Sequence, residues 1–294
     1  MDPLELGGPA DVARLLSDAG YLCDEGLATA AFLCLQMQRP LLLEGESGTG
    51  KTAFAEALAT ATGWPLFRLQ CYQGVGASQA LYAWDFPRQI LHLRSLEAVS
   101  DGSNVEDARL CLYDEKYLLS RPILHALRAA PAILLIDEVD RADEEFEALL
   151  LEVLSTYQVR IPELGTIAAT LPPVVVLTSN STREMHHALR RRCLYHWMDH
   201  PSLASEVAIV RHRVPNVSET LARQLVDVVH QLRHRSGLPK SPGLVETLDW
   251  ARALERLGVA HLDVEAAAAT VGAIVKNREN TSRVQAAAVE LMTV

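Results

Sequence analysis

The sequence lacks an excess of positive charge. It carries 27 Lys and Arg against 37 Asp and Glu, a formal net charge of -10. Affinity for nucleic-acid backbones comes from clustered Lys and Arg. The one basic run, Arg190 to Arg192, is too short to line a duplex groove. We therefore expect no nucleic-acid partner.

Cysteines are few and show no pairing pattern. There are five, an odd number, and no two are spaced as Cys-x-x-Cys. This excludes the disulfide framework of a small secreted domain and predicts free thiols in a reducing compartment. The cysteines are Cys23, Cys34, Cys71, Cys111 and Cys193.

Long apolar runs are also missing. No run approaches the ~20 residues that a membrane-spanning helix needs. The first residues, MDPLELGGPAD, lack the basic stretch and apolar core of a signal peptide. The expected location is the cytoplasm, either free or peripheral to the inner membrane.

Short apolar runs alternate with helical patterns through about residue 200. Five runs predict strands, at residues 40–45, 65–72, 132–137, 174–180 and 193–198. Such runs, separated by helices, are typical of a parallel sheet covered on both faces. The stretch 143–155 predicts one of these helices, with Asp143 as its cap. The fold class is therefore α/β.

The pattern changes after Pro201, where strand signals stop. We place a domain boundary near residues 200–202, which predicts an α/β core at 1–200 and an all-α lid at 201–294. Helical patterns in the lid lie at about 203–213, 219–235, 244–257, 263–277 and 281–292.

Two segments exceed what a simple doubly wound sheet needs. Residues 73–130 are too long for one helix and indicate an insertion, which is usually functional at this size. Residues 157–173 alternate around Pro-Glu-Leu-Gly and predict a β-hairpin. In the insertion, Trp84 and Phe86 are read first as core anchors and second as contacts to a client protein.

The most specific motif is GESGTGKT at residues 45–52, which matches G-x-x-x-x-G-K-[ST]. A predicted strand precedes it and a strong helix former follows. Backbone N–H groups and the helix dipole would bind phosphate oxygens, Lys51 would neutralise β- and γ-phosphate charge, and Thr52 would ligate Mg²⁺. The predicted nucleotide-binding residues are Gly45, Glu46, Ser47, Gly48, Thr49, Gly50, Lys51, Thr52 and Asp137, with Thr52 and Asp137 serving Mg²⁺.

Asp137 and Glu138 follow another apolar run and complete the motif. Asp137 would hold the Mg²⁺ shell, and Glu138 would act as general base on the attacking water. Asn180 ends the next strand, where it is either a turn residue or a carboxamide that holds the water or the γ-phosphate. Arg190, Arg191 and Arg192 form either a solvated turn or a source of an arginine finger.

The order of these motifs resembles the AAA+ ATPases, and more narrowly their MoxR-type branch. The resemblance covers nearly the whole chain and implies a P-loop AAA+ core with a helix-2 insertion, a pre-sensor hairpin and a helical lid. It implies that Asn180 is sensor 1, that Arg192, with Arg191 second, is the arginine finger, and that ATP lies between subunits of a hexameric ring. It rests on SRPILHAL (120–127), LLIDEVDRADEEFEALLLEVLSTYQV (134–159), LTSN (177–180) and LRRRC (189–193).

Within that branch, four stretches resemble the CoxD-type accessory ATPases, which are associated with maturation of the metal centre of aerobic carbon monoxide dehydrogenase. This implies a chaperone-like remodeller of a metalloenzyme client, working with a partner that carries a von Willebrand factor A domain. The stretches are LQCYQG (69–74), ALYAWDFPRQILHLRS (80–95), TSNSTREMHHALRRRCLYHW (178–197) and SPGLVETLDWARAL (241–254).

The lid departs from the family pattern at one position. MoxR-type lids often carry Ser-Pro-Arg, whose arginine is sensor 2, whereas residues 241–243 here are Ser-Pro-Gly. Lys240 and Arg252 are the nearest substitutes, but neither sits at the motif position. Sensor 2 stays unassigned.

Other functions are compatible with parts of the sequence. A small-molecule kinase would use the same phosphate loop, and a nucleotide-gated scaffold would bind ATP with little hydrolysis. A GTPase is disfavoured because no Asn-Lys-x-Asp motif is present. Cys193, His196 and His200 have spacing that superficially suits zinc, but strand alternation would point the first two to opposite faces.

Overall fold

A computed structural model describes residues 6–99, 112–234 and 242–274. The chain divides into two compact units. The first comprises Met1–Ala13, Asp24–Glu44 and Leu58–His196; the second comprises Arg14–Cys23, Gly45–Ala57 and Trp197–Val294. Helices α1 (Pro9–Asp18) and α3 (Lys51–Thr62) run from one unit into the other.

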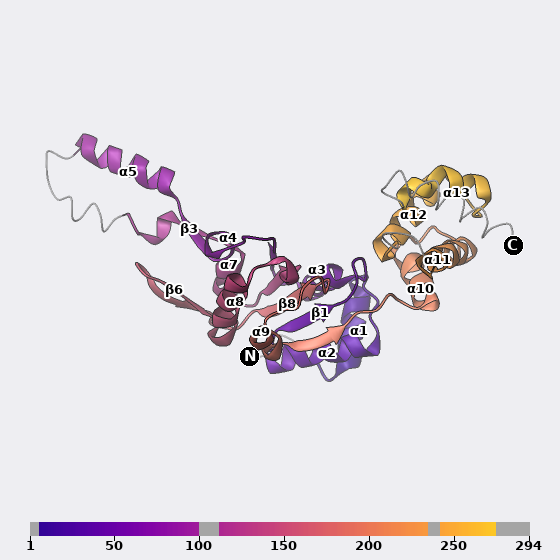
Figure 1. Cartoon of the computed structure of the whole chain (residues 1–294), viewed down its shortest axis with the longest axis horizontal. Helices are drawn as coiled ribbons and strands as arrows, with labels where there is room; N and C mark the ends of the chain where they lie inside the picture. Colours follow the sequence, from indigo (N-terminus) through magenta and orange to yellow (C-terminus); the bar gives the residue numbers. More distant parts are fainter. Residues whose placement is uncertain (1–5, 100–111, 235–241, 275–294) are drawn as a thin grey trace. The chain divides into compact units, whose positions relative to one another are not determined.

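A five-stranded sheet forms the centre of the first unit (Figure 1). Its order is β2-β5-β8-β1-β9, and the pairs β2–β5, β5–β8 and β8–β1 are parallel. The strands are β1 (Leu41–Glu44), β2 (Leu66–Gln70), β5 (Ile133–Asp137), β8 (Val174–Ser179) and β9 (Leu194–Trp197). They confirm the five predicted strands and the α/β fold class.

The central strands are apolar because both faces of the sheet are covered. Every residue of β1 and β5 is buried, which is why these runs do not alternate with polar residues. The helices of this unit are α2 (Glu25–Met37), α7 (Pro122–Arg128), α8 (Glu144–Thr156) and α9 (His187–Arg192), with the short turn η2 (Val139–Arg141) after β5. The Asp143 carboxylate accepts from the Phe146 N–H at 2.9 Å, which confirms the predicted cap of α8.

The insertion and the hairpin are both present. Figure 1 shows α5 extending away from the sheet and the β6 strand standing off it. The hairpin pairs β6 (Gln158–Ile161) with β7 (Gly165–Ala168), and β3 pairs antiparallel with β4 in the insertion. The insertion contains α4 (Ala77–Ala80), β3 (Tyr82–Trp84), α5 (Phe86–Val99), η1 (Glu115–Tyr117) and β4 (Leu118–Ser120).

The two aromatic residues singled out in the insertion differ in environment. Trp84 is partly buried, and its ring centroid lies 6.3 Å from that of Tyr82 and 5.2 Å from that of Tyr113. Phe86 is 60% exposed. Trp84 is therefore an anchor, whereas Phe86 is open to contact another protein.

Among residues 203–234 and 242–274 of the second unit, the regular structure is all helical. Its helices are α10 (Leu203–Arg213), α11 (Glu219–His234), α12 (Leu244–Arg256), α13 (Val264–Thr270) and η3 (Val271–Ala273). Their apolar faces enclose a core around Trp250, which is fully buried. This confirms four predicted helices; the fifth, at 281–292, lies outside the described residues. Within the described part of the chain, no helix combines the length and apolarity needed to span a membrane.

Candidate functional site

The phosphate-loop motif lies in the second unit, directly after the last residue of β1. The Lys51 ammonium is 6% exposed and donates to the carbonyl oxygens of Gly45, at 2.7 Å, and Glu46, at 2.6 Å. These two bonds close the loop around the lysine stem. Thr52 follows in the first turn of α3, as predicted.

Glycines are required in this loop for two different reasons. Gly48 and Gly50 have φ of 86° and 99°, a region that side chains disfavour. At Gly45, a Cβ would lie 2.2 Å from the backbone oxygen of Met198. A substitution at any of these positions would change the shape of the loop.

In the first unit, the Asp137 carboxylate ends β5 and is buried. One of its oxygens accepts from the Thr178 hydroxyl at 2.5 Å, and the other accepts from the Arg68 guanidinium at 2.5 Å. Thr178 also accepts from the N–H of Glu138 at 2.9 Å. This hydroxyl therefore links the carboxyl ends of β5 and β8.

Glu138 follows in a left-handed conformation, with φ of 54°, that non-glycine residues rarely adopt. Its carboxylate accepts from the Asn180 side-chain amide at 3.1 Å and from the Gln70 amide at 2.9 Å. The Arg141 guanidinium lies 3.1 Å from the same carboxylate. The structure thus brings together Asp137, Glu138 and Asn180, which the sequence predicted from separate strands.

Asp140 fixes the segment that carries Asn180. The Asp140 side chain accepts from the N–H groups of Asn180 and Thr182, at 3.2 and 3.0 Å, and from the Thr182 hydroxyl, at 2.5 Å. Burial raises the pKa of the Asp140 carboxyl, but the hydrogen bonds from Thr182 and Asn180 outweigh burial and lower the pKa below its usual value. The carboxylate is therefore ionised and holds the loop as an acceptor.

Two of the three arginines of α9 are engaged within the first unit. Arg190 donates to the buried Glu44 carboxylate at 2.9 Å, and its guanidinium lies 5.0 Å from the Tyr195 ring centroid. Arg192 donates to the carbonyl oxygens of Leu154 and Ser155, at the end of α8, at 3.3 and 2.7 Å.

Arg191 differs from its two neighbours. Its side chain is exposed, and in the described part of the chain it makes no hydrogen bond or ion pair. The Arg39 guanidinium donates to the carbonyl oxygens of Arg191 and Arg192, at 3.0 and 3.1 Å, and so holds the end of α9. The geometry presents Arg191 to solvent on a fixed helix end.

The Ser-Pro-Gly position of the lid meets the phosphate loop within the second unit. The Leu244 N–H donates to the Gly48 carbonyl at 3.0 Å. A Cβ on Gly243 would lie 2.9 Å from the Gly48 Cα, so this contact has no room for an arginine. Arg252 pairs with Asp249 at 3.3 Å, and Lys240 lies outside the described residues.

The donor chemistry fits magnesium held through a nucleotide. Thr52 supplies a hydroxyl and Asp137 a carboxylate, the hard oxygen ligands that Mg²⁺ prefers. No group of three His, Cys, Asp or Glu side chains able to hold a metal occurs among residues 6–99, 112–234 and 242–274. Magnesium bound through one or two side chains and phosphates suits donors of this kind. The zinc reading of Cys193, His196 and His200 gains no support.

The described cysteines are free thiols, as predicted. Burial raises the pKa of Cys34, Cys71 and Cys193 to about 12 in each case. Thiols of this kind stay protonated and unreactive at neutral pH. Cys111 lies outside the described residues.

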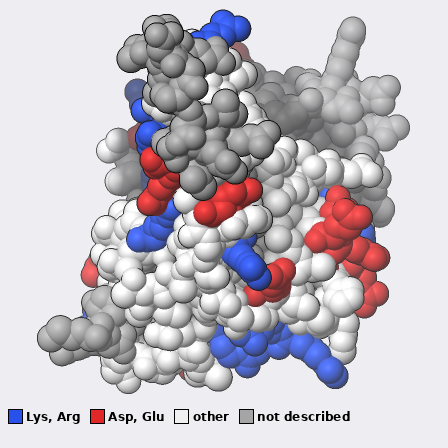
Figure 2. Space-filling view, turned by 90° about the vertical axis from the view of Figure 1, so that its left-hand side faces the viewer, with Lys and Arg blue, Asp and Glu red and all other residues white. Residues whose placement is uncertain are grey.

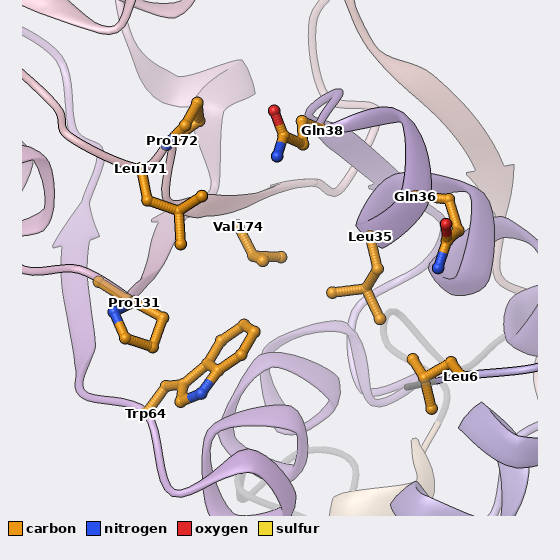
Figure 3. Close-up of a pocket in the computed structure, with 10 residues that line it drawn as sticks. Leu6, Leu35, Gln36, Gln38, Trp64, Pro131, Leu171, Pro172 and Val174 are labelled. Carbon is orange, nitrogen blue, oxygen red and sulfur yellow. The ribbon is translucent and has the colours of Figure 1, made fainter. Parts of the chain in front are cut away.

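One cavity lies beside the amino-terminal ends of β5 and β8, at the other end of these strands from Asp137 and Asn180 (Figure 3). Trp64, Pro131, Leu171 and Val174 line it, with Leu35 of α2 on the other side. Its volume of about 40 Å³ holds at most a few water molecules. It is a packing hollow and too small for a nucleotide.

Charges of both signs share the face shown in Figure 2. Basic and acidic side chains lie in small groups separated by uncharged residues. On the part of this face that undescribed residues do not cover, the largest basic group lies along the lower edge of the view.

Four residues of the site were missed by sequence reasoning: Arg68, Gln70, Thr178 and Asp140. Arg68 and Gln70 stand two positions apart in a predicted strand, which places them on one face. That spacing is a usable signal. Thr178 and Asp140 carry no comparable signal, because their partners come from other elements.

Comparison with known proteins relates the chain to one family. Residues 40–193, just over half of the chain, match the family described as AAA domain (dynein-related subfamily). Protein NorQ of Paracoccus denitrificans (strain Pd 1222) is 27% identical over 252 residues, which cover 82% of this chain and 83% of NorQ.

Two further proteins show weaker similarity. The uncharacterized protein SH1500 of Staphylococcus haemolyticus (strain JCSC1435) is 22% identical over 219 residues, covering 72% of this chain and 75% of SH1500. Among solved structures, the Thermotoga maritima RuvB Holliday junction branch migration motor is similar with a TM-score of 0.45 and 16% identity, covering 90% of this chain and 69% of that one.

Proposed function

Because this chain belongs to the dynein-related AAA family and is a MoxR-type AAA+ ATPase, we propose that it remodels a metalloenzyme during assembly. As a member of that family it hydrolyses ATP and uses Mg²⁺. The proposed client is aerobic carbon monoxide dehydrogenase, whose metal centre it would help to mature. The CoxD-like stretches of the sequence support this client.

The proposed roles of the nucleotide-binding residues follow their chemistry. The loop from Gly45 to Thr52 binds the phosphates, and Lys51 neutralises their charge. Thr52 and Asp137 serve Mg²⁺ as oxygen donors. The ammonium of Lys51, held by two loop carbonyls, supports its assignment.

Glu138 is the proposed general base, and Asn180 positions its carboxylate. The observation that carries this assignment is the hydrogen bond of 3.1 Å from the Asn180 amide to Glu138. A carboxylate held by amides from two neighbouring strands is oriented for proton abstraction from a water molecule. Gln70 supplies the second amide.

Arg191 is the proposed arginine finger, in preference to Arg192. Arg192 is bound to the end of α8 in its own subunit, so reaching a neighbour would break two hydrogen bonds. Arg191 is exposed and its helix end is fixed by Arg39. A finger supplied in this way is worth ~10³–10⁵ in rate where measured.

The proposed assembly is a homo-oligomeric ring, a hexamer, of protomers with a nucleotide-binding core at 1–200 and a lid at 201–294. The proposed partner carries a von Willebrand factor A domain. The insertion, with Phe86 exposed on α5, is the proposed client contact. The proposed location is cytoplasmic, with attachment at the inner membrane only through partners.

Replacement of the proposed base tests this function. We expect Glu138→Gln to bind Mg-ATP with unchanged affinity and to lose at least ~10²-fold of the ATPase rate, because the water loses its base. Glu152→Gln, an exposed glutamate on α8, is the matched control and should hydrolyse ATP normally. ATP turnover at the wild-type rate in Glu138→Gln would refute the assignment.

A cellular measurement separates the alternatives. We expect carbon monoxide dehydrogenase to acquire its complete metal centre in cells with the wild-type chain and to stay incomplete with Glu138→Gln. Full maturation with the variant would instead support a nucleotide-gated scaffold. ATP turnover that depends on a small acceptor and yields its phosphate ester would support a kinase.

A further inference from the structure

The Asp137 carboxylate is unusually enclosed for a group that is expected to serve a metal. Its side chain is 3% exposed. A buried carboxylate is costly unless hydrogen bonds and an opposite charge compensate it. Thr178 provides a hydrogen bond to one oxygen, and the charge comes from Arg68, at 2.5 Å from the other.

Arg68 reaches this position from the neighbouring strand. It lies on β2, two residues before Gln70, and both side chains face the end of β5. The same guanidinium nitrogen also donates to the Gln70 side-chain oxygen at 3.1 Å. Gln70 in turn donates to Glu138. One guanidinium therefore contacts Asp137 directly and Glu138 through a single amide.

We propose that Arg68 is a positioning residue, the built-in counter-ion of Asp137, which Mg²⁺ displaces when the nucleotide binds. This rests on the proposed role of Asp137. A guanidinium and a divalent cation at one carboxylate repel each other strongly in a partly buried site. The Arg68 side chain is 47% exposed, so it can leave Asp137 toward solvent at little steric cost.

The exchange has a measurable consequence. The ion pair between Arg68 and Asp137 stabilises the metal-free protein, and this stabilisation is lost when Mg²⁺ binds. Removing the guanidinium therefore destabilises the metal-free protein and increases the affinity of the nucleotide complex for Mg²⁺. A residue with only a structural role would lower nucleotide affinity at every Mg²⁺ concentration and leave the Mg²⁺ midpoint unchanged.

The experiment titrates free Mg²⁺ against the full-length protein and fluorescently labelled ADP, with hydrolysis playing no part. In Arg68→Gln we expect the Mg²⁺ midpoint to fall at least about threefold, and the melting temperature of the metal-free protein to drop by a few degrees. Arg68→Lys, which keeps the charge but not the planar fork, should lie between Arg68→Gln and the wild type.

Controls separate this inference from the proposed function. Arg128→Gln, which breaks a pair with the exposed Glu115, should leave the Mg²⁺ midpoint unchanged. A midpoint in Arg68→Gln and Arg68→Lys that is equal to or above that of the wild type overturns the proposal. If Asp137→Asn shifts the midpoint while both Arg68 variants do not, only the Arg68 role fails. An unchanged midpoint in Asp137→Asn removes the metal role of Asp137 itself.

Discussion

At the scale of single residues, buried polar side chains set the positions of the groups expected to do chemistry. Asp140 is 3% exposed and receives three hydrogen bonds from the segment after β8. Asn180 owes its place beside Glu138 to this acceptor. A carboxylate performs this task well because it can accept several bonds and donates none.

Asp140→Asn tests this role. The new amide would present N–H groups to the donors of Thr182, so we expect a loss of about 1–3 kcal/mol of unfolding free energy. ATPase activity should also fall, because Asn180 would lose its fixed position. Urea unfolding measures the first effect. Asp249→Asn, at an exposed carboxylate in the lid, should change neither quantity.

The same substitution carries a pH signature. The pKa of Asp140 in the folded protein lies below its usual value, so its stabilisation is present above the unfolded pKa of about 3.9 and is lost as pH falls through the folded pKa. The stability difference between wild type and Asp140→Asn should therefore be largest near neutral pH and shrink below about pH 4. A difference that grows on acidification would contradict this.

At the scale of elements, helix ends are tied to one another by arginines. Arg192 binds the last carbonyls of α8, and Arg39 binds those of α9. Cations are favourable at helix C-termini because the unsatisfied carbonyls lie there. The three arginines of α9 therefore have different environments: Arg190 pairs with Glu44, Arg192 binds the end of α8, and Arg191 is exposed. The basic run in the sequence does not reveal these differences.

In the lid, one buried ion pair joins three elements. The Arg233 guanidinium pairs with Glu206 at 2.6 Å and donates to the Pro242 carbonyl at 2.6 Å, and the Thr247 hydroxyl donates to Glu206 at 2.6 Å. Both charged side chains are at most 5% exposed. The network links α10 and α11 to the start of α12, where Gly243 and Leu244 meet the phosphate loop.

Glu206→Gln should destabilise the protein strongly. It leaves Arg233 buried without a counter-charge, which typically costs about 3–5 kcal/mol. Glu219→Gln removes an exposed partner of Arg211 and is the matched control, with an expected cost of at most about 1 kcal/mol. Differential scanning calorimetry on both variants checks this. Equal melting temperatures for the two variants would show that the buried pair is not stabilising.

At the scale of the whole molecule, the proposed ring divides each active site between neighbours. Lys51 would act in one subunit and Arg191 in the next. In such a head-to-tail ring, a subunit lacking one residue can be complemented by a neighbour that retains it. This follows from the proposal that a single chain cannot complete its own site.

Mixing two inactive variants tests this arrangement. We expect Lys51→Ala and Arg191→Ala each to lose nearly all ATPase activity. Random mixed rings of the two in equal amounts should regain about a quarter of the wild-type rate, since one junction in four pairs an intact Lys51 with an intact Arg191. Arg192→Ala keeps both Lys51 and Arg191, so it should retain ATPase activity without a complementing partner. An Arg191→Ala variant with normal activity, or a mixture without activity, rules out the finger role.

The sequence by itself determined the five strands of the central sheet, the helices that follow the phosphate loop and Asp143, four helices of the lid, and the two motifs. The apolar run at 132–137 and the cap at Asp143 are local signals. The strand and the helix that they specify can therefore be predicted without knowledge of distant residues. The phosphate loop is equally local, because one continuous segment supplies the glycines and Lys51. The same holds for the insertion and the hairpin, whose excess length and turn residues are visible in the chain.

Only the tertiary structure decided the partners of the polar side chains. Arg68 meets Asp137 across 69 positions of sequence, and Asp140 meets Thr182 across 42. Such pairs depend on strand order, which placed β5 between β2 and β8. The proposal of Arg191 in preference to Arg192 likewise rests on the contacts of Arg192 with the distant carbonyls of α8. Long-range hydrogen bonds produce no periodicity or motif in the sequence, because the two partners become neighbours only in the folded chain.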